Sequence, residues 1–225
     1  VLDVYLTEAA LERHSEIWDE AVAAGLYVHV TTQQVMDAMS PDAQGLLAVV
    51  ATEEATGSEA LAAALEGARL VAVLTQAQDP GNAGTIIRAA DAAGADAVVL
   101  VRGSVDPTAP KVVRSTAGSL FHLPVVTGVA LDDAVTALHN AGLTVLAADG
   151  RGDFDLFEAE SLLEAPSAWL LGNEAHGLPS EALSRADAVV SIPIYGKAES
   201  LNVAAAAAVC LYASARAQAQ NSGRS

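Results

Sequence analysis

The feature that most constrains the fold is the alternation of short, continuous apolar segments with helical patterns between residues 69 and 217. Apolar runs of this length, almost without polar residues, are typical of strands buried on both faces of a parallel sheet. We expect strands at 70–74, 97–101, 124–126, 143–147, 168–171 and 188–192. We expect helices at 82–94, 110–119, 131–141, 179–184 and 201–217. The predicted fold class is therefore α/β, a parallel sheet flanked by helices.

A second, smaller α/β pattern comes first in the chain. We expect strands at 1–7, 26–30 and 46–51, with helices at 8–24 and 32–39. Three strands and two helices make a thin core, so this unit looks incomplete. The predicted organisation is a small domain at 1–52, a linker or linking helix at 53–68, a large domain at 69–217 and a polar tail at 218–225.

Composition excludes several classes of protein. Hydrophobic residues make up 52% of the chain, which is enough for a sizeable core and argues against disorder. No run of ~20 apolar residues is free of charge or turn residues, so we expect no membrane span. The single cysteine, Cys210, excludes an internal disulfide and a cysteine-built metal site, and we expect it to be buried and inert. Nothing at the start reads as a signal peptide, so we expect a cytoplasmic protein. We also expect no metal.

The net charge of −17 argues against a nucleic-acid partner, because such proteins usually carry a basic surface. The acidity is uneven, however: residues 1–68 contribute −11 and residues 69–225 contribute −6. Ten of the eleven basic residues lie in the second part, and four of them fall within 27 residues: Arg88, Arg102, Lys111 and Arg114. A local patch of this kind can still bind phosphate.

A glycine-bearing loop at 79–85 joins a predicted strand to a predicted helix. This is a usual place to bind an anion or a nucleotide. Its spacing is GxxG without a following GK[ST], so neither the dinucleotide fingerprint nor the P-loop applies. Arg88 lies one helical turn beyond Gly84 and can project towards a ligand. The alternative is a plain helix cap, with Asn82 as the N-cap and a solvated arginine.

A second loop follows the strand at 168–171. Gly172 and Gly177 flank Glu174, and glycine permits close backbone approach to a flat ligand such as adenine. Glu174 could accept hydrogen bonds from hydroxyl or amide groups. His176 is a candidate general base, but a loop histidine without a visible partner more often has no functional role. An ordinary turn remains the alternative reading of this loop.

A third segment runs from Ile192-Pro193 through a polar loop at 195–199 into an apolar helix. We expect Ser200 to cap this helix. Asn202 in the first turn would be unusual for a purely structural helix start. A loop held between a buried strand and a buried helix is rigid enough to form a site.

Together the three segments closely resemble the SpoU (TrmH-like) family of RNA 2′-O-ribose methyltransferases, in the SPOUT superfamily. The first is similar to the family's NxGxIxR motif, the second to GxExxG, and the third to IP…SLNV. The residues that carry the resemblance are Asn82, Gly84, Ile86 and Arg88, then Gly172, Glu174 and Gly177, then Ile192, Pro193 and Ser200–Val203. It covers residues 70–215. The first 50 residues resemble the RNA-binding domain, similar to ribosomal protein L30e, that often precedes this catalytic domain, without its opening strand and helix.

The resemblance implies a C-terminal trefoil knot, a rare exception to the rule that chains do not thread loops. It also implies a homodimer and S-adenosylmethionine as cofactor. By position, the cofactor contacts would be made chiefly by backbone groups of Ala148, Gly172, Ile192 and Leu201.

The implied reaction is attack of a ribose 2′-oxygen on the methyl carbon of the sulfonium. Arg88 would be the essential residue, and we favour phosphate binding and oxyanion stabilisation over a role as base. The residues expected to position it, the ribose and the loops are Asn82, Glu174, Ser200 and Asn202. The residues expected to hold the RNA backbone are Lys111, Arg114 and Ser115, although a solvated charged face is an equal alternative for Lys111.

Ribosomal RNA, in particular 23S rRNA, is the expected substrate. The alternatives are a tRNA ribose methyltransferase, a non-catalytic RNA-binding protein on the same fold, and a nucleotide-dependent α/β enzyme of another class. Two features depart from the family's pattern: Ala204 stands where a serine is common, and the N-terminal part is strongly acidic.

Overall fold

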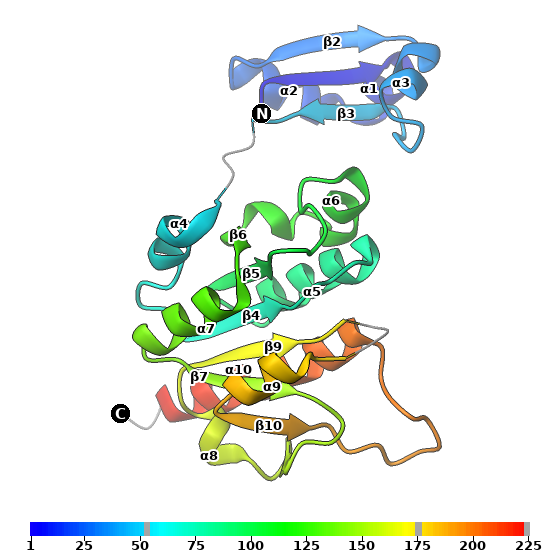
Figure 1. Ribbon diagram of the computed structural model, residues 1–225. Coiled ribbons are helices and arrows are strands. Elements are labelled where there is room, and N and C mark those ends of the chain that lie inside the picture. The colour runs from blue at the N-terminus through cyan, green and yellow to red at the C-terminus, as the bar shows by residue number, and fades with distance from the viewer. Residues whose placement is uncertain (52–54, 174–176, 223–225) are drawn as a thin grey trace. The chain divides into compact units, whose positions relative to one another are not determined.

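The computed structural model describes residues 1–51, 55–173 and 177–222. The chain divides into two compact units, Val1–Glu53 and Glu54–Ser225 (Figure 1).

The first unit is a three-stranded sheet with helices. Strand β1 (Asp3–Thr7) lies in the middle, with β2 (Tyr27–Thr31) parallel to it on one side and β3 (Leu46–Val49) antiparallel on the other. Its core is small, with Val4, Leu6, Ala10 and Ala21 buried.

The helix predicted at 8–24 is two helices, so that prediction was wrong in this respect. Helix α1 (Glu8–Arg13) ends at His14, whose φ of −136° and ψ of 47° are not helical, and α2 (Ser15–Ala23) follows at once. No glycine or proline marks this break in the sequence. Helix α3 (Gln33–Met39) begins at the cap Thr32, whose hydroxyl accepts a hydrogen bond from the Val35 amide.

The second unit contains a seven-stranded sheet in which every pairing is parallel, as predicted from the apolar runs. The strand order is β6-β5-β4-β9-β7-β10-β8. The strands are β4 (Leu70–Leu74), β5 (Ala97–Val101), β6 (Val125–Val129), β7 (Thr144–Ala148), β8 (Phe154–Asp155), β9 (Ser167–Leu171) and β10 (Ala188–Ser191).

Helices cover both faces of this sheet (Figure 1). One apolar cluster joins the sheet to α5 (Pro80–Ala92), α6 (Pro110–Thr116), α8 (Glu160–Leu163) and α10 (Val203–Ser222). The other joins it to α4 (Gly57–Ala64), α7 (Leu131–Asn140) and α9 (Ser180–Arg185). The largest fully buried side chain, Trp169, donates from its indole nitrogen to the Ser214 hydroxyl at 2.9 Å. That bond satisfies a polar group which burial would otherwise penalise.

Two segments outside the predicted large domain belong to this unit. The segment expected as linker contains α4, whose Leu61 is 1% exposed in the second cluster. Helix α10 continues past the predicted end at 217, to Ser222. Gln218 in this extension is buried, and its side-chain amide donates to the Arg69 and Ala165 carbonyls at 3.2 and 2.9 Å. The short β8 and α8 were not predicted, since two- and four-residue elements carry no periodic signal.

Cys210 is buried in α10, and burial raises the pKa of its thiol to about 12. It is an inert core residue, as expected. Among the described residues, no helix is both long enough and apolar enough to span a membrane.

The order of the last strands forces one connection to cross another strand. Strand β10 lies between β7 and β8, which are consecutive in the chain. The connection from β7 to β8 therefore passes over the carboxyl end of β10. Gly152 marks the crossing: a Cβ there would stand 2.6 Å from the Val189 carbonyl oxygen and 2.8 Å from the Ser191 nitrogen. Only glycine lets the two backbones approach this closely.

Candidate functional site

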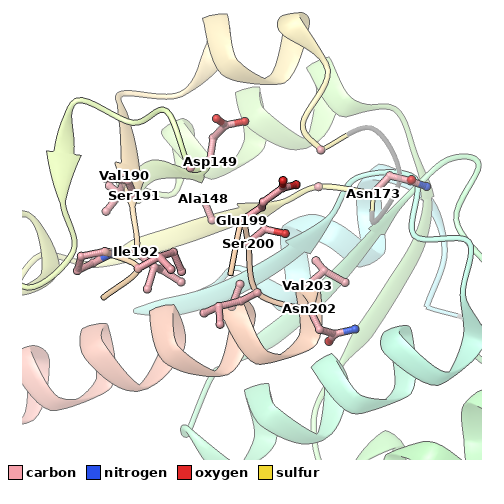
Figure 2. Close-up of a pocket in the computed structure, with 17 residues that line it drawn as sticks. Ala148, Asp149, Asn173, Val190, Ser191, Ile192, Glu199, Ser200, Asn202 and Val203 are labelled. Carbon is pink, nitrogen blue, oxygen red and sulfur yellow. The ribbon is translucent and has the colours of Figure 1, made fainter. Parts of the chain in front are cut away.

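The carboxyl ends of β7, β9 and β10 surround a cavity of about 730 Å³ (Figure 2). Ligands of open α/β sheets bind at this edge, and the volume suits a nucleoside-sized molecule. All four residues predicted as cofactor contacts line the cavity: Ala148, Gly172, Ile192 and Leu201. Ser200 and Asn202, predicted from the third motif, line it as well. The structure thus brings residues from three distant segments together, while their contact with a cofactor remains a prediction.

Close backbone contacts join Gly172 and Asn173, at the end of β9, to Gly177 and Leu178. The backbones of Asn173 and Gly177 exchange two hydrogen bonds, of 3.0 and 2.8 Å. A Cβ on Gly172 would stand 2.5 Å from the Gly177 carbonyl carbon and 2.6 Å from the Leu178 nitrogen. Gly172 therefore permits backbone packing within the wall of the cavity, which is a more specific role than the close ligand approach we expected.

Asp149 is a cavity residue that the sequence analysis did not identify. Its carboxylate accepts from the Arg151 amide at 2.9 Å and from the Arg151 guanidinium Nε at 3.1 Å. The hydrogen bond from the Arg151 side chain lowers the pKa of Asp149 and outweighs its partial burial. The two interactions hold the start of the loop that crosses β10. The only signal in the sequence was its position two residues after a predicted strand.

Asn202, rather than Ser200, caps helix α10, so the predicted cap was wrong. Its side-chain oxygen accepts from the Ala204 and Ala205 amides at 2.9 and 3.3 Å. The helix begins at Val203, which places Asn202 at the cap position and leaves Ser200 in the preceding loop. The unusual asparagine is thus explained by the ordinary preference of N-caps.

The first and third motifs are joined by a hydrogen bond. The Asn202 amide nitrogen donates to the Asn82 side-chain oxygen at 3.2 Å, across 120 residues of sequence. Asp79 caps helix α5, because its carboxylate accepts from the Asn82 backbone amide at 2.8 Å. The alternative of Asn82 as N-cap is therefore wrong.

Replacing Asn202 separates its two roles. We expect Asn202→Ala to lower the free energy of unfolding by about 1 kcal/mol, because the α10 amides lose their cap. Asn202→Asp keeps the capping oxygen and should retain most of that stability, while losing the amide donor to Asn82. Urea denaturation of the two variants checks this. Equal destabilisation by both would show that the link to Asn82, and not the cap, carries the energy.

Arg88 lies on the exposed face of α5 and is not among the residues that line the cavity. Helix α5 packs beside α10 in the same direction: Asn82 and Asn202 meet near their starts, and the Tyr212 hydroxyl in the middle of α10 donates to the Ala92 carbonyl at the end of α5, at 3.1 Å. In the described part of the chain, the Arg88 side chain makes no hydrogen bond or ion pair. The guanidinium is thus available to a ligand.

The predicted RNA-contacting residues lie on α6, which packs against α5. Lys111 and Arg114 are exposed. The half-buried Ser115 hydroxyl instead donates within the protein, to the carbonyls of Pro80 at 3.1 Å and Lys111 at 2.8 Å. A Cβ on Gly84 would collide with that hydroxyl and stand 2.7 Å from the Val112 carbonyl oxygen. Gly84 therefore serves the close packing of the two helices, and the described contacts give Ser115 the same structural role.

Two residues of the second motif, Glu174 and His176, lie outside the described residues. Among those that are described, no group of three or more histidine, cysteine or carboxylate side chains could hold a metal ion.

Comparisons with known proteins agree on one family. The family model described as the SpoU rRNA Methylase family matches residues 69–212. A Bacillus subtilis protein named 23S rRNA (guanosine(2553)-2′-O)-methyltransferase RlmP is 42% identical over 151 residues, covering 66% of this chain and 58% of that protein. A Streptomyces viridochromogenes 23S rRNA (uridine(2479)-2′-O)-methyltransferase is 41% identical over 142 residues, covering 61% of this chain and 49% of that protein. The matches thus span about half to three fifths of the length of these relatives.

The solved structures extend the likeness to both units. The SpoU methyltransferase AviRb from Streptomyces viridochromogenes, in complex with the cofactor AdoMet, has a TM-score of 0.82 and 28% identity, covering 98% of this chain and 84% of that one. An AdoMet-bound rRNA methyltransferase from Sinorhizobium meliloti has a TM-score of 0.76 and 29% identity, covering 96% and 79%. The family match extends over more than half of the chain and contains all three motifs. On this evidence the chain belongs to the SpoU rRNA methylase family.

Proposed function

We propose that this protein is an S-adenosylmethionine-dependent RNA 2′-O-ribose methyltransferase that acts on ribosomal RNA, with 23S rRNA as the favoured substrate. The observation that carries the proposal is the Asn202–Asn82 hydrogen bond. It attaches the helix of Arg88 to the segment that lines the cavity, so one rigid unit can serve both a cofactor and an RNA. The relatives named as 23S rRNA methyltransferases support the choice of substrate.

The cavity suits S-adenosylmethionine. Its described lining combines apolar side chains, such as Val190 and Ile192, with backbone groups at the ends of three strands. Such a lining can hold an adenine ring and a thioether, with hydrogen bonds from main-chain groups. Bound there, the cofactor would supply an electrophilic methyl group.

The chain's own residues would bind and align the RNA. Arginine does not lose its proton in proteins, so we assign Arg88 to binding a phosphate and stabilising the developing 2′-oxyanion, rather than to removing a proton. Asn202 and Asn82 would hold α5, and with it Arg88, at a set position relative to the cavity. Ser200 and Glu174 would orient the ribose and the loops. Alignment of two reacting atoms can by itself supply much of the acceleration.

Three further features complete the proposal. The crossing at Gly152 supports a trefoil knot in which the chain after β10 passes beneath the 149–153 connection. Exposed apolar side chains on and beside α10, including Leu201 and Tyr212, support a homodimer. Residues 1–52 would act as an L30e-like RNA-binding domain, in which a few specific contacts offset the acidic charge. An enzyme that modifies ribosomal RNA would work in the cytoplasm.

A methyl-transfer assay tests the proposal. We expect label from methyl-tritiated S-adenosylmethionine to enter ribosomal RNA that lacks ribose methylation, and to enter total tRNA only at background level. Nuclease digestion should then yield one 2′-O-methylated nucleotide. Transfer to tRNA alone would overturn the substrate. Binding of the cofactor without transfer to either RNA would favour a non-catalytic RNA-binding protein.

A further inference from the structure

The cavity has an uneven charge. The described residues that line it include two carboxylates, Asp149 and Glu199, and no lysine or arginine. The negative charge of Asp149 is compensated, because the Arg151 guanidinium lies 3.1 Å from its carboxylate. Arg151 itself points to solvent, with a side chain that is 82% exposed. The net effect of this pair on a ligand is small, which leaves Glu199 as the uncompensated charge of the described wall.

Glu199 lies in the segment that leads into α10, directly before Ser200 (Figure 2). In the described part of the chain, its carboxylate has no hydrogen bond and no ion pair. The nearest basic residue along the chain, Lys197, is exposed and is not a lining residue. A carboxylate at a cavity wall without a protein partner is a candidate for ligand recognition, because binding cavities use a few placed polar groups for specificity.

The proposed reaction changes the charge of the molecule that this cavity would hold. During transfer, a bond forms between the ribose 2′-oxygen and the methyl carbon while the bond from that carbon to sulfur breaks. The electron pair of the broken bond stays on sulfur, and the 2′-hydroxyl proton passes to solvent water. The positive sulfonium thereby becomes a neutral thioether. Donor and product otherwise share the same nucleoside and amino-acid groups, so charge is the main property by which a protein can tell them apart.

We propose that Glu199 is a specificity-determining residue that makes the cavity favour the cationic methyl donor over the neutral product. The proposal rests on the proposed function. A carboxylate near the sulfonium stabilises the bound donor by charge attraction. The neutral thioether has no such attraction, so the product dissociates more readily. Because Glu199 is exposed, the expected preference is modest, about fivefold, and it weakens as salt screens the charge.

Titration calorimetry of the whole chain with three ligands tests this role. The ligands are S-adenosylmethionine, S-adenosylhomocysteine and sinefungin, which carries an amine-bearing carbon in place of the sulfonium. We expect Glu199→Gln, which keeps the shape and removes the charge, to weaken binding of the two cations about fivefold and to leave the thioether unchanged. The matched control is Glu66→Gln, at an exposed carboxylate that does not line the cavity. It should change none of the three affinities.

The outcomes separate this inference from the function it rests on. Equal weakening of all three ligands by Glu199→Gln would overturn it, because Glu199 would then hold a group that donor and product share. No change in any affinity would overturn it too. If the wild-type protein binds none of the three, the cofactor assignment itself fails. Thermal melting of the Gln variant near that of the wild type, expected for an exposed side chain, excludes misfolding as the cause.

Discussion

Replacing Arg88 with alanine is expected to lower the rate of methyl transfer to RNA at least 100-fold, a size typical of losing one group that stabilises a developing oxyanion. Cofactor affinity should stay within about twofold, because Arg88 does not line the cavity. Stability should change by no more than about 0.5 kcal/mol, since the side chain is exposed and unpaired in the described structure. Single-turnover transfer assays measure the rate, titration calorimetry measures the cofactor affinity, and urea denaturation measures the stability.

Two further variants sharpen this test. Arg88→Lys keeps the positive charge but loses the bidentate hydrogen-bonding geometry of the guanidinium. If the group binds phosphate or an oxyanion, this variant should be faster than Arg88→Ala but slower than the wild type. Arg69→Ala removes another exposed arginine, at the amino end of β4, the opposite edge of the sheet from the cavity. It should retain near-normal turnover. Near-normal turnover of Arg88→Ala would mean that Arg88 has no catalytic role.

Replacing Gly172 with alanine is expected to weaken cofactor binding at least tenfold and to destabilise the protein by about 1–3 kcal/mol, the cost of overpacking a tight site. The added methyl group would stand within 2.8 Å of three backbone atoms of Gly177 and Leu178. Backbone atoms cannot move aside as a flexible side chain can. The backbones at Gly172 and Gly177 would have to move apart, and the cavity wall that these two residues line would shift.

Gly150 provides a matched control for this variant. It lines the same cavity, yet a Cβ there would meet nothing within 4 Å. Gly150→Ala should therefore change stability and cofactor affinity little. The comparison uses urea denaturation for stability and calorimetry for S-adenosylmethionine binding. If the two glycine variants behaved alike, close backbone packing at Gly172 would not be what forms the site.

Much of the fold could be predicted because its signal is local. A strand buried on both faces must be apolar throughout. Segments such as 70–74 and 97–101 can therefore be recognised as strands from their own five residues. The short β8 and the break at His14 were missed for the same reason, because neither changes the local apolar pattern.

The site residues were predicted in part from the family motifs, which name residue types at fixed spacing. The resemblance to the family led to Gly172, Ile192 and Leu201 within the motifs and to Ala148 outside them, and the structure brings all four to one cavity. It did not lead to Asp149 or Glu199, which line the same cavity outside the positions taken from the motifs. Capping preference misassigned the cap of α10, because serine and asparagine are equally good caps and only the backbone path distinguishes them.

By itself, the sequence determined the parallel α/β class, the three motifs and the edge of the sheet where they meet, since the carboxyl ends of parallel strands share one edge. Only the tertiary structure decided the strand order, with β10 between β7 and β8. It also decided the close backbone contacts, at Gly152 where the connection crosses β10 and at Gly172 after β9. It alone revealed the hydrogen bond between Asn82 and Asn202. The physical reason is range: strand and helix patterns arise from neighbours along the chain, whereas strand order and a contact across 120 residues depend on the packing of the whole domain.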